Sequence, residues 1–186
     1  MRAFVSVDLN NETVKRNLEV LQQALESSGT HVKSVKSSNL HFTIRFLGEI
    51  SEEETRNVIN IMKDIDISSF TISFKGLGYF PDESRISVVW VGVDEGKNEL
   101  TKLAEQVETR IRSLGFKPEK KFTPHLTICR LRNELNKDLI INASKPYVDK
   151  LFGETVVDSI KLKKSTLSPD GPIYNDVFTL HLGKKT

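Results

Sequence analysis

The sequence contains a single cysteine, Cys129, among 186 residues. One thiol excludes an internal disulfide and a zinc site built from cysteines. The sequence also lacks the run of roughly 20 apolar residues that a membrane-spanning helix needs. The apolar stretch at the N-terminus is shorter than a secretory signal and is interrupted by Asp8. These absences lead us to expect a protein of the reducing cytoplasm without membrane contact.

A large excess of charge of either sign is also absent. The chain has 27 basic and 25 acidic side chains, and its net charge is +2. A protein that binds its partner through bulk positive charge carries a larger excess. Hydrophobic residues make up 38% and charged residues 28% of the chain, which is ordinary for a globular protein. We therefore expect one domain over residues 1–186 that binds any anion at a local site.

The hydrophobic pattern changes between strand and helix periods along the chain. Helical spacing predicts helices that begin near Asn11, Ser51 and Lys97. Strands are predicted over 3–9, 31–36, 40–47, 70–77, 85–93, 122–131, 156–167 and 173–182. Residues 133–146 are polar and poorly periodic, and they are predicted to form a loop, with or without a helical turn. Because helices and strands mix without regular β-α-β alternation, an α+β fold is favoured over a doubly wound parallel sheet.

Two short segments of the sequence share a motif. Residues 40–47 read Leu-His-Phe-Thr-Ile-Arg-Phe-Leu, and residues 124–131 read Pro-His-Leu-Thr-Ile-Cys-Arg-Leu. Side chains two residues apart leave the same face of a strand. His41 is therefore predicted to lie beside Thr43 with Arg45 on the same face, and His125 beside Thr127. The repeat indicates two related lobes that face each other across a cleft.

The two motif histidines are the candidate catalytic pair. Imidazoles with the ordinary pKa of about 6.5 serve as general base and general acid at neutral pH. The two threonine hydroxyls are suited to donate hydrogen bonds to phosphate oxygens. Two histidines without neighbouring carboxylates or thiols make a poor metal site. The set of His41, His125, Thr43 and Thr127 predicts phosphodiester chemistry without a metal ion.

These motifs resemble those of the 2H phosphoesterase superfamily, and within it the RNA 2′,3′-cyclic phosphodiesterases, also called 2′-5′ RNA ligases. The resemblance runs from Arg2-Ala3-Phe4-Val5 to Gly171-Pro172-Ile173-Tyr174. It implies a bilobal α+β fold, in which two related, interleaved halves place antiparallel sheets and flanking helices around a central cleft. It also implies hydrolysis of a terminal RNA 2′,3′-cyclic phosphate to a 2′-phosphate, without metal or other cofactor. In some members it implies reversible 2′-5′ ligation of tRNA halves.

The family's site residues are carried over by matching positions. The resemblance makes His41 and His125 the acid–base pair, Thr43 and Thr127 phosphate donors, and Arg130 a phosphate ligand. We assign His125 as the base that activates water and His41 as the acid that protonates the leaving O3′. The two motifs are too alike for the sequence alone to fix these roles. Strict alternation sends Arg130 to the face opposite His125, so a bulge after Thr127 is needed to turn it into the cleft.

Several other positions have two interpretations. Phe46 occupies the place of Arg130 in the first motif, and it either stacks on a base or, as we favour, packs in the core beside Phe42. Tyr174 either reaches the cleft or packs on a sheet edge. Cys129 is predicted to share a face with Thr127 as a small buried residue rather than a nucleophile. Six lysines either guide an RNA backbone or form a solvated surface: Lys117, Lys120, Lys121, Lys161, Lys163 and Lys164.

Three classes of function stay open from the sequence. The leading one is a monomeric enzyme that acts on RNA cyclic phosphate ends. A second enzyme with the same residues acts on small cyclic nucleotides of the ADP-ribose cyclic phosphate type. A non-catalytic module binds RNA or a nucleotide and keeps that binding when either histidine is replaced. A structural domain has no nucleotide affinity, and replacing the histidines then affects only its stability.

Overall fold

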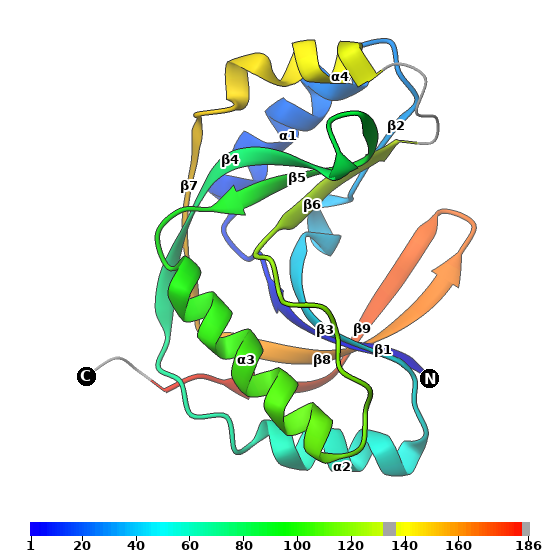
Figure 1. The fold of residues 1–186 in the computed structure, drawn as a ribbon, viewed down its shortest axis with the longest axis vertical. Helices are drawn as coiled ribbons and strands as arrows, with labels where there is room; N and C mark the ends of the chain where they lie inside the picture. The colour runs from blue at the N-terminus through cyan, green and yellow to red at the C-terminus, as the bar shows by residue number, and fades with distance from the viewer. Residues whose placement is uncertain (132–136, 184–186) are drawn as a thin grey trace.

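The computed structural model describes residues 1–131 and 137–183 (Figure 1). Within these residues there are four α-helices, α1 (Glu12–Glu26), α2 (Glu52–Met62), α3 (Lys97–Ser113) and α4 (Lys137–Ser144). The strands are β1 (Arg2–Asp8), β2 (Val32–Ser34), β3 (His41–Glu49), β4 (Phe70–Asp82), β5 (Arg85–Val93), β6 (Leu126–Leu131), β7 (Leu151–Val157), β8 (Ser159–Ser168) and β9 (Gly171–His181). Two short 3-10 helices, η1 (Ser37–Asn39) and η3 (Lys145–Tyr147), complete the elements.

The strands form two antiparallel sheets, and each sheet takes strands from both the early and the late part of the chain. One sheet has the order β3-β1-β8-β9 and the other the order β2-β6-β5-β4-β7. Helix α3 packs on β3 of the four-stranded sheet, and α2 packs on α3 (Figure 1). Helix α1 packs on β2, β6 and β7 of the five-stranded sheet, and α4 packs on α1. The chain passes from one sheet to the other several times, so each sheet contains early and late strands. The α+β fold with antiparallel sheets is confirmed, and the division into one domain of two pseudo-symmetric lobes stays a prediction.

Local sequence signals explain where the first two helices begin. Asn11 caps α1, because its side-chain oxygen accepts a hydrogen bond from the Val14 N–H at 3.0 Å. Ser51 and Glu54 form a capping box at the start of α2, in which each side chain accepts from the other's backbone N–H. The apolar stripes of the helices then pack on the sheets and position them around the cleft.

Several predicted boundaries were wrong, among them the end of the strand predicted over 70–77, which continues to Asp82 as β4. The strand predicted over 122–131 begins at Leu126, so His125 precedes it. Within the loop predicted over 133–146, residues 137–144 form α4, whose apolar Leu139, Ile140 and Ile141 are consecutive and therefore showed no helical period in the sequence. Residues 132–136 of that predicted loop lie outside the described residues. The strand predicted over 156–167 is the end of β7 and most of β8, and the chain changes sheets between them at Asp158.

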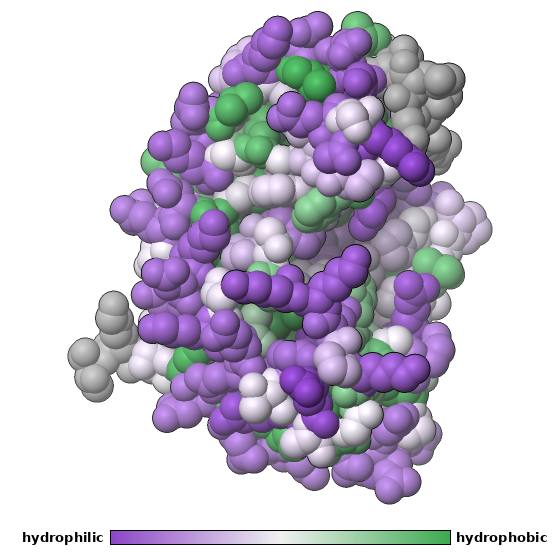
Figure 2. Space-filling view, viewed as in Figure 1, coloured by the Kyte–Doolittle hydropathy of each residue, from purple (hydrophilic) through white to green (hydrophobic). Residues whose placement is uncertain are grey.

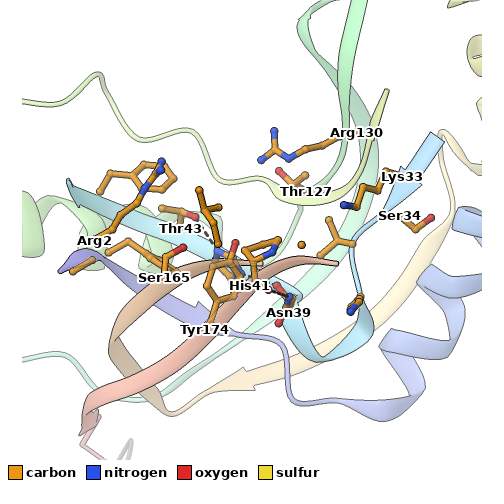
Figure 3. A pocket seen from close by; sticks show the side chains of 18 of the residues that line it. Arg2, Lys33, Ser34, Asn39, His41, Thr43, Thr127, Arg130, Ser165 and Tyr174 are labelled. Atoms are coloured by element: carbon orange, nitrogen blue, oxygen red, sulfur yellow. Dashed lines mark hydrogen bonds between the residues drawn. The ribbon is translucent and has the colours of Figure 1, made fainter. Parts of the chain in front are cut away.

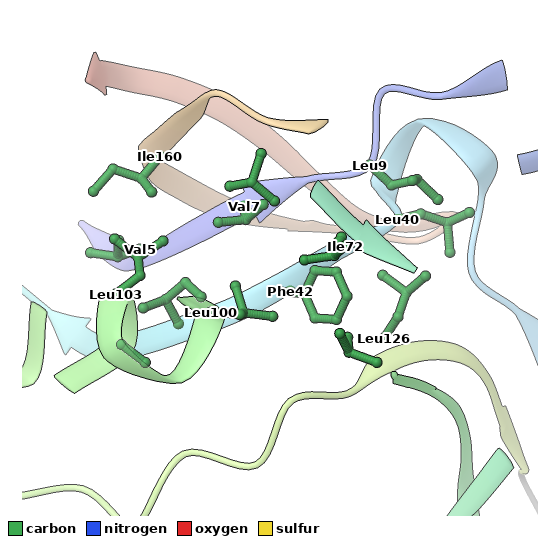
Figure 4. Packing of buried hydrophobic residues seen from close by; sticks show 14 of the residues in the cluster. Val5, Val7, Leu9, Leu40, Phe42, Ile72, Leu100, Leu103, Leu126 and Ile160 are labelled. Carbon is green, nitrogen blue, oxygen red and sulfur yellow. The ribbon is translucent and has the colours of Figure 1, made fainter. Parts of the chain in front are cut away.

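A hydrophobic core lies between the sheets and supports the first motif from behind. Phe42 of β3 and Phe74 of β4 stack with ring centroids 5.8 Å apart, so this contact joins the two sheets. Both rings are at most 1% exposed. Figure 4 shows Phe42 among Leu40, Ile72 and Leu126. Because Phe42 stands between the histidine and the threonine of the first motif, its burial directs these two side chains to the other face.

Candidate active site

A cleft of about 550 Å³ lies between the two sheets. The space-filling view is hollowed in this region (Figure 2). Strand β3 of the four-stranded sheet and strand β6 of the five-stranded sheet both contribute side chains to its wall. The structure brings every site residue predicted from the sequence to this one cleft: His41, Thr43, Phe46, His125, Thr127, Arg130 and Tyr174.

A β-bulge turns Arg130 into the cleft. Thr127 and Cys129 of β6 pair with consecutive residues of β5, so Ile128 is the extra residue. Beyond the bulge the alternation is shifted by one position. Cys129 is 0% exposed, and Arg130 lines the cleft together with Thr127. The bulge needed after Thr127 is therefore present, and the predicted shared face of Cys129 and Thr127 was wrong.

The first motif contains the same bulge. Thr43 and Arg45 of β3 pair with consecutive residues of β1, which leaves Ile44 as the extra residue. Arg45 turns inward to 5% exposure, and Phe46 lines the cleft with 54% of its surface exposed. The predicted core position of Phe46 and the predicted cleft position of Arg45 were both wrong for this reason. In each motif the extra residue follows the histidine by three positions, so the repeat extends to backbone geometry.

The two histidines are held by the same kind of hydrogen bond. Nδ1 of His41 lies 2.7 Å from the backbone oxygen of Asn39 (Figure 3). Nδ1 of His125 lies 2.6 Å from the backbone oxygen of Thr123. A carbonyl oxygen only accepts, so each Nδ1 carries a proton and each neutral ring keeps Nε2 as its basic nitrogen. Nε2 of His41 lies 3.0 Å from Oγ1 of Thr43, so this hydroxyl donates to the imidazole.

Aromatic rings flank both imidazoles. The rings beside His41 belong to Phe4 and Tyr174, with centroids 5.1 and 5.2 Å away. The ring of Phe80 meets His125 edge-on, with centroids 4.8 Å apart. Of its two interpretations, Tyr174 therefore follows the first, because it lines the cleft and contacts a motif histidine. These rings remove water from the imidazoles and limit their rotation.

Burial lowers the pKa of both histidines. Desolvation is the largest cause for each, and the positive charge of Arg130 acts in the same direction on both. The hydrogen bonds to the backbone carbonyls oppose this effect without overcoming it. Burial also raises the pKa of the Cys129 thiol to about 12, so Cys129 stays protonated and does not act as a nucleophile.

Arg45 fixes the segment that leads to the second motif. Its guanidinium forms ion pairs with Glu108 at 2.6 Å and Glu119 at 3.1 Å. It also donates a hydrogen bond to the backbone oxygen of Lys117 at 2.5 Å. The buried arginine of the first motif thus holds residues that precede His125 in the chain.

The cations of the cleft differ from those that the sequence singled out. Lys161 and Lys163 form ion pairs with Asp8 and Asp176, and the remaining four lysines of that group do not line the cleft. Sequence reasoning missed Lys33, Lys36 and Arg2, which do line it. No motif marks these three residues, and the pairing of β2 with β6 is the signal that places Lys33 there.

In the part of the chain that the structure describes, no three His, Cys, Asp or Glu side chains are grouped closely enough to hold a metal ion. None of the helices in residues 1–131 and 137–183 combines the length and apolarity needed to cross a membrane. The expected cytoplasmic location stays a prediction.

Known proteins share this architecture. The family described as AKAP7 2′5′ RNA ligase-like domain matches residues 3–182. The RNA 2′,3′-cyclic phosphodiesterase of Methanocaldococcus jannaschii is 37% identical over 174 residues, which cover 94% of this chain and 96% of that protein. That of Aquifex aeolicus is 41% identical over 155 residues, covering 81% and 82%. The crystal structure of TT0787 from Thermus thermophilus superposes with a TM-score of 0.83 at 27% identity over 100% of both chains.

The fold, the family match and the curated relatives define a 2H phosphoesterase. Within that superfamily, the chain belongs to the 2′-5′ RNA ligase-like family. The resemblance recognised from the two His-x-Thr motifs is thereby confirmed. The apo structure of E. coli LigT has the same fold, with a TM-score of 0.78 at 22% identity.

Proposed function

We propose that this chain hydrolyses the 2′,3′-cyclic phosphate at the end of an RNA to a 2′-phosphate without a metal ion. The observation that carries the proposal is the pair of histidines on opposite walls of one cleft, each with Nδ1 on a backbone carbonyl. Relatives at 37% and 38% identity are named RNA 2′,3′-cyclic phosphodiesterase, which supports the same substrate here.

In the proposed mechanism, one Nε2 atom accepts a proton and the other donates one. Nε2 of His125 removes a proton from water, and the water oxygen bonds to phosphorus. The bond between phosphorus and O3′ breaks, and O3′ takes the proton from Nε2 of protonated His41. The product carries the phosphate on O2′. Exchange with solvent returns the two imidazoles to their starting protonation states.

The phosphate is proposed to bind between the two motifs. Once His41 is protonated, the Thr43 hydroxyl no longer donates to its Nε2. Thr43 and Thr127 then each donate a hydroxyl hydrogen bond to a non-bridging oxygen of the phosphate, and these contacts strengthen as negative charge builds up. Arg130 forms no ion pair with another described residue, so its guanidinium is available for a charge-assisted contact. The exposed ring of Phe46 offers a surface on which the terminal base stacks.

Ligation follows from the same residues within this proposal. A ribose 5′-hydroxyl takes the place of water, loses its proton to His125 and bonds to phosphorus while the bond to O3′ breaks. The product is a 2′-5′ linkage, and the reverse reaction regenerates the two ends. tRNA halves supply one end of each kind. We propose that the chain acts on such ends as a monomer.

The experiment that tests this function compares substrates in the presence of EDTA. The purified chain is incubated with a short RNA that ends in a 2′,3′-cyclic phosphate, and separately with ADP-ribose cyclic phosphate. We expect turnover of the RNA, with the higher kcat/KM of the two. Turnover of ADP-ribose cyclic phosphate alone supports the small-nucleotide enzyme. Tight binding of the RNA without any product supports the non-catalytic module.

The lowered pKa values predict the pH dependence of this reaction. In the active form, one of the two imidazoles is protonated on Nε2 and the other is neutral. Both histidine pKa values lie below the ordinary value of about 6.5. Above both values, the fraction with one proton decreases tenfold per pH unit. We therefore expect kcat/KM to fall about tenfold between pH 7 and pH 8 at constant ionic strength. A rate that is constant or rises over this interval contradicts the assignment.

A further inference from the structure

The cleft holds more positive charge than one cyclic phosphate neutralises. Four cations line it, and none of them forms an ion pair with another residue of the described chain: Arg2, Lys33, Lys36 and Arg130. Among the described lining residues, Asp170 is the acidic one. The whole chain has a net charge of only +2, whereas the lining of this cleft carries four cationic side chains and one acidic one. A cyclic phosphodiester carries a single negative charge, which leaves cations for a second anion.

Strand pairing places two of these cations at one end of the cleft. Lys33 of β2 lies directly opposite Arg130 of β6 in an antiparallel pair. Side chains at directly opposite positions share a face of the sheet. Lys33 therefore continues the basic surface outward from Arg130, and Lys36 follows shortly before η1. Figure 3 shows Lys33 at the end of the cleft opposite Arg2 and Thr43.

The other end of the cleft carries the aromatic surface. Phe46 lies on β3 beyond Thr43, and its ring centroid is 6.1 Å from that of Phe4 on β1. This exposed ring suits a nucleobase. Arg2 pairs with Glu49 and Phe4 with Phe46, so Phe46 lies toward the Arg2 end of the cleft. Figure 3 shows Lys33 at the other end, so the stacking surface and the free lysines lie on different sides of the histidine pair.

The covalent structure of a nucleotide matches this division. In a ribose 2′,3′-cyclic phosphate, the base is attached at C1′ beside C2′, and the 5′ oxygen extends from C4′ beside C3′. The base and the 5′ oxygen therefore extend from the two flanks of the C2′–C3′ edge that carries the cyclic phosphate. When the base stacks on Phe46 and the cyclic phosphate lies between His41 and His125, the 5′ oxygen points toward Lys33 and Lys36.

We propose that Lys33 and Lys36 bind the phosphate on the 5′ side of the terminal nucleotide and so make the enzyme selective for RNA chains. This inference rests on the proposed function. It predicts that a substrate with a 5′ phosphate is preferred over a nucleoside 2′,3′-cyclic phosphate that lacks one. The second anion is a backbone phosphate, and recognition of it needs no particular base sequence.

The test measures kcat/KM for three substrates: adenosine 2′,3′-cyclic phosphate, its 5′-phosphorylated form, and the dinucleotide ApA with a 2′,3′-cyclic phosphate. In the wild type we expect both substrates with a 5′ phosphate to exceed the first by about tenfold or more, as hydrogen bonds to charged groups provide. In Lys33→Ala/Lys36→Ala we expect this ratio to fall to about one. The control Lys120→Ala/Lys121→Ala removes two exposed lysines outside the cleft and keeps the wild-type ratio.

Different outcomes separate the two proposals. An unchanged ratio in Lys33→Ala/Lys36→Ala, or equal losses on all three substrates, overturns the 5′-phosphate site while the proposed function stands. If the wild type hydrolyses none of the three, the proposed function fails. Calorimetric titration then decides the inference alone: tighter binding of the 5′-phosphorylated compound that depends on the two lysines supports it, and equal binding of both mononucleotides overturns it.

Discussion

Replacing either His41 or His125 by alanine is expected to lower kcat on RNA with a cyclic phosphate end by about 10²–10⁴-fold. Each variant removes one of the two Nε2 atoms that move protons in the proposed mechanism. The double variant is expected to lose little more than either single one, because residues that act as a unit are not additive. Single-turnover measurements with enzyme in excess report the chemical step directly.

A matched control separates catalysis from folding. His31 is exposed and does not line the cleft, so His31→Ala should keep both the wild-type kcat and the wild-type melting temperature. The two catalytic variants should remain folded, which circular dichroism checks. If either motif variant retains more than a tenth of the wild-type kcat, that histidine is not the acid or base of this reaction.

The second large effect concerns stability. Phe42→Ala is expected to lower the free energy of unfolding by about 3–5 kcal/mol. The ring of Phe42 is 1% exposed, and its stacking on Phe74 joins the two sheets, so its removal leaves a cavity at their junction. Urea unfolding followed by circular dichroism measures the change.

Phe46→Ala is the matched control for Phe42→Ala. The two phenylalanines stand on the same strand, but Phe46 is 54% exposed. Its replacement should change the free energy of unfolding by no more than about 0.5 kcal/mol, as expected for a surface position. Equal losses in the two variants contradict the bulge at Ile44, because without that bulge Phe46 belongs to the core face.

Much of the fold was predictable because it depends on local signals. The stripe of apolar residues in α1, the capping box of Ser51 and Glu54, and the alternation in β3 each identify an element from a few neighbouring residues. The short helix α4 gave no such signal, because its apolar residues Leu139, Ile140 and Ile141 are consecutive and not at helical spacing. The catalytic pair was predictable because its motif occurs twice, and one copy alone is an ordinary strand pattern.

The remaining site residues depend on pairing that no local pattern reports. A bulge adds one unpaired residue to one strand of a pair, and the period of two in the sequence carries no trace of it. The positions of Phe46 and Arg45 were therefore misjudged, and Arg130 was placed through the resemblance alone. Lys33 enters the site only because β2 pairs with β6, two strands far apart in the sequence.

The measurement that tests the central claim most directly is the identity of the product end. RNA with a 2′,3′-cyclic phosphate is incubated with the wild-type chain in EDTA, and the released end is typed by phosphorus NMR. The proposed mechanism predicts a 2′-phosphate, because the His41 proton goes to O3′ and the bond between phosphorus and O3′ breaks. A 3′-phosphate, which requires O2′ to leave, or RNA that stays unchanged contradicts it.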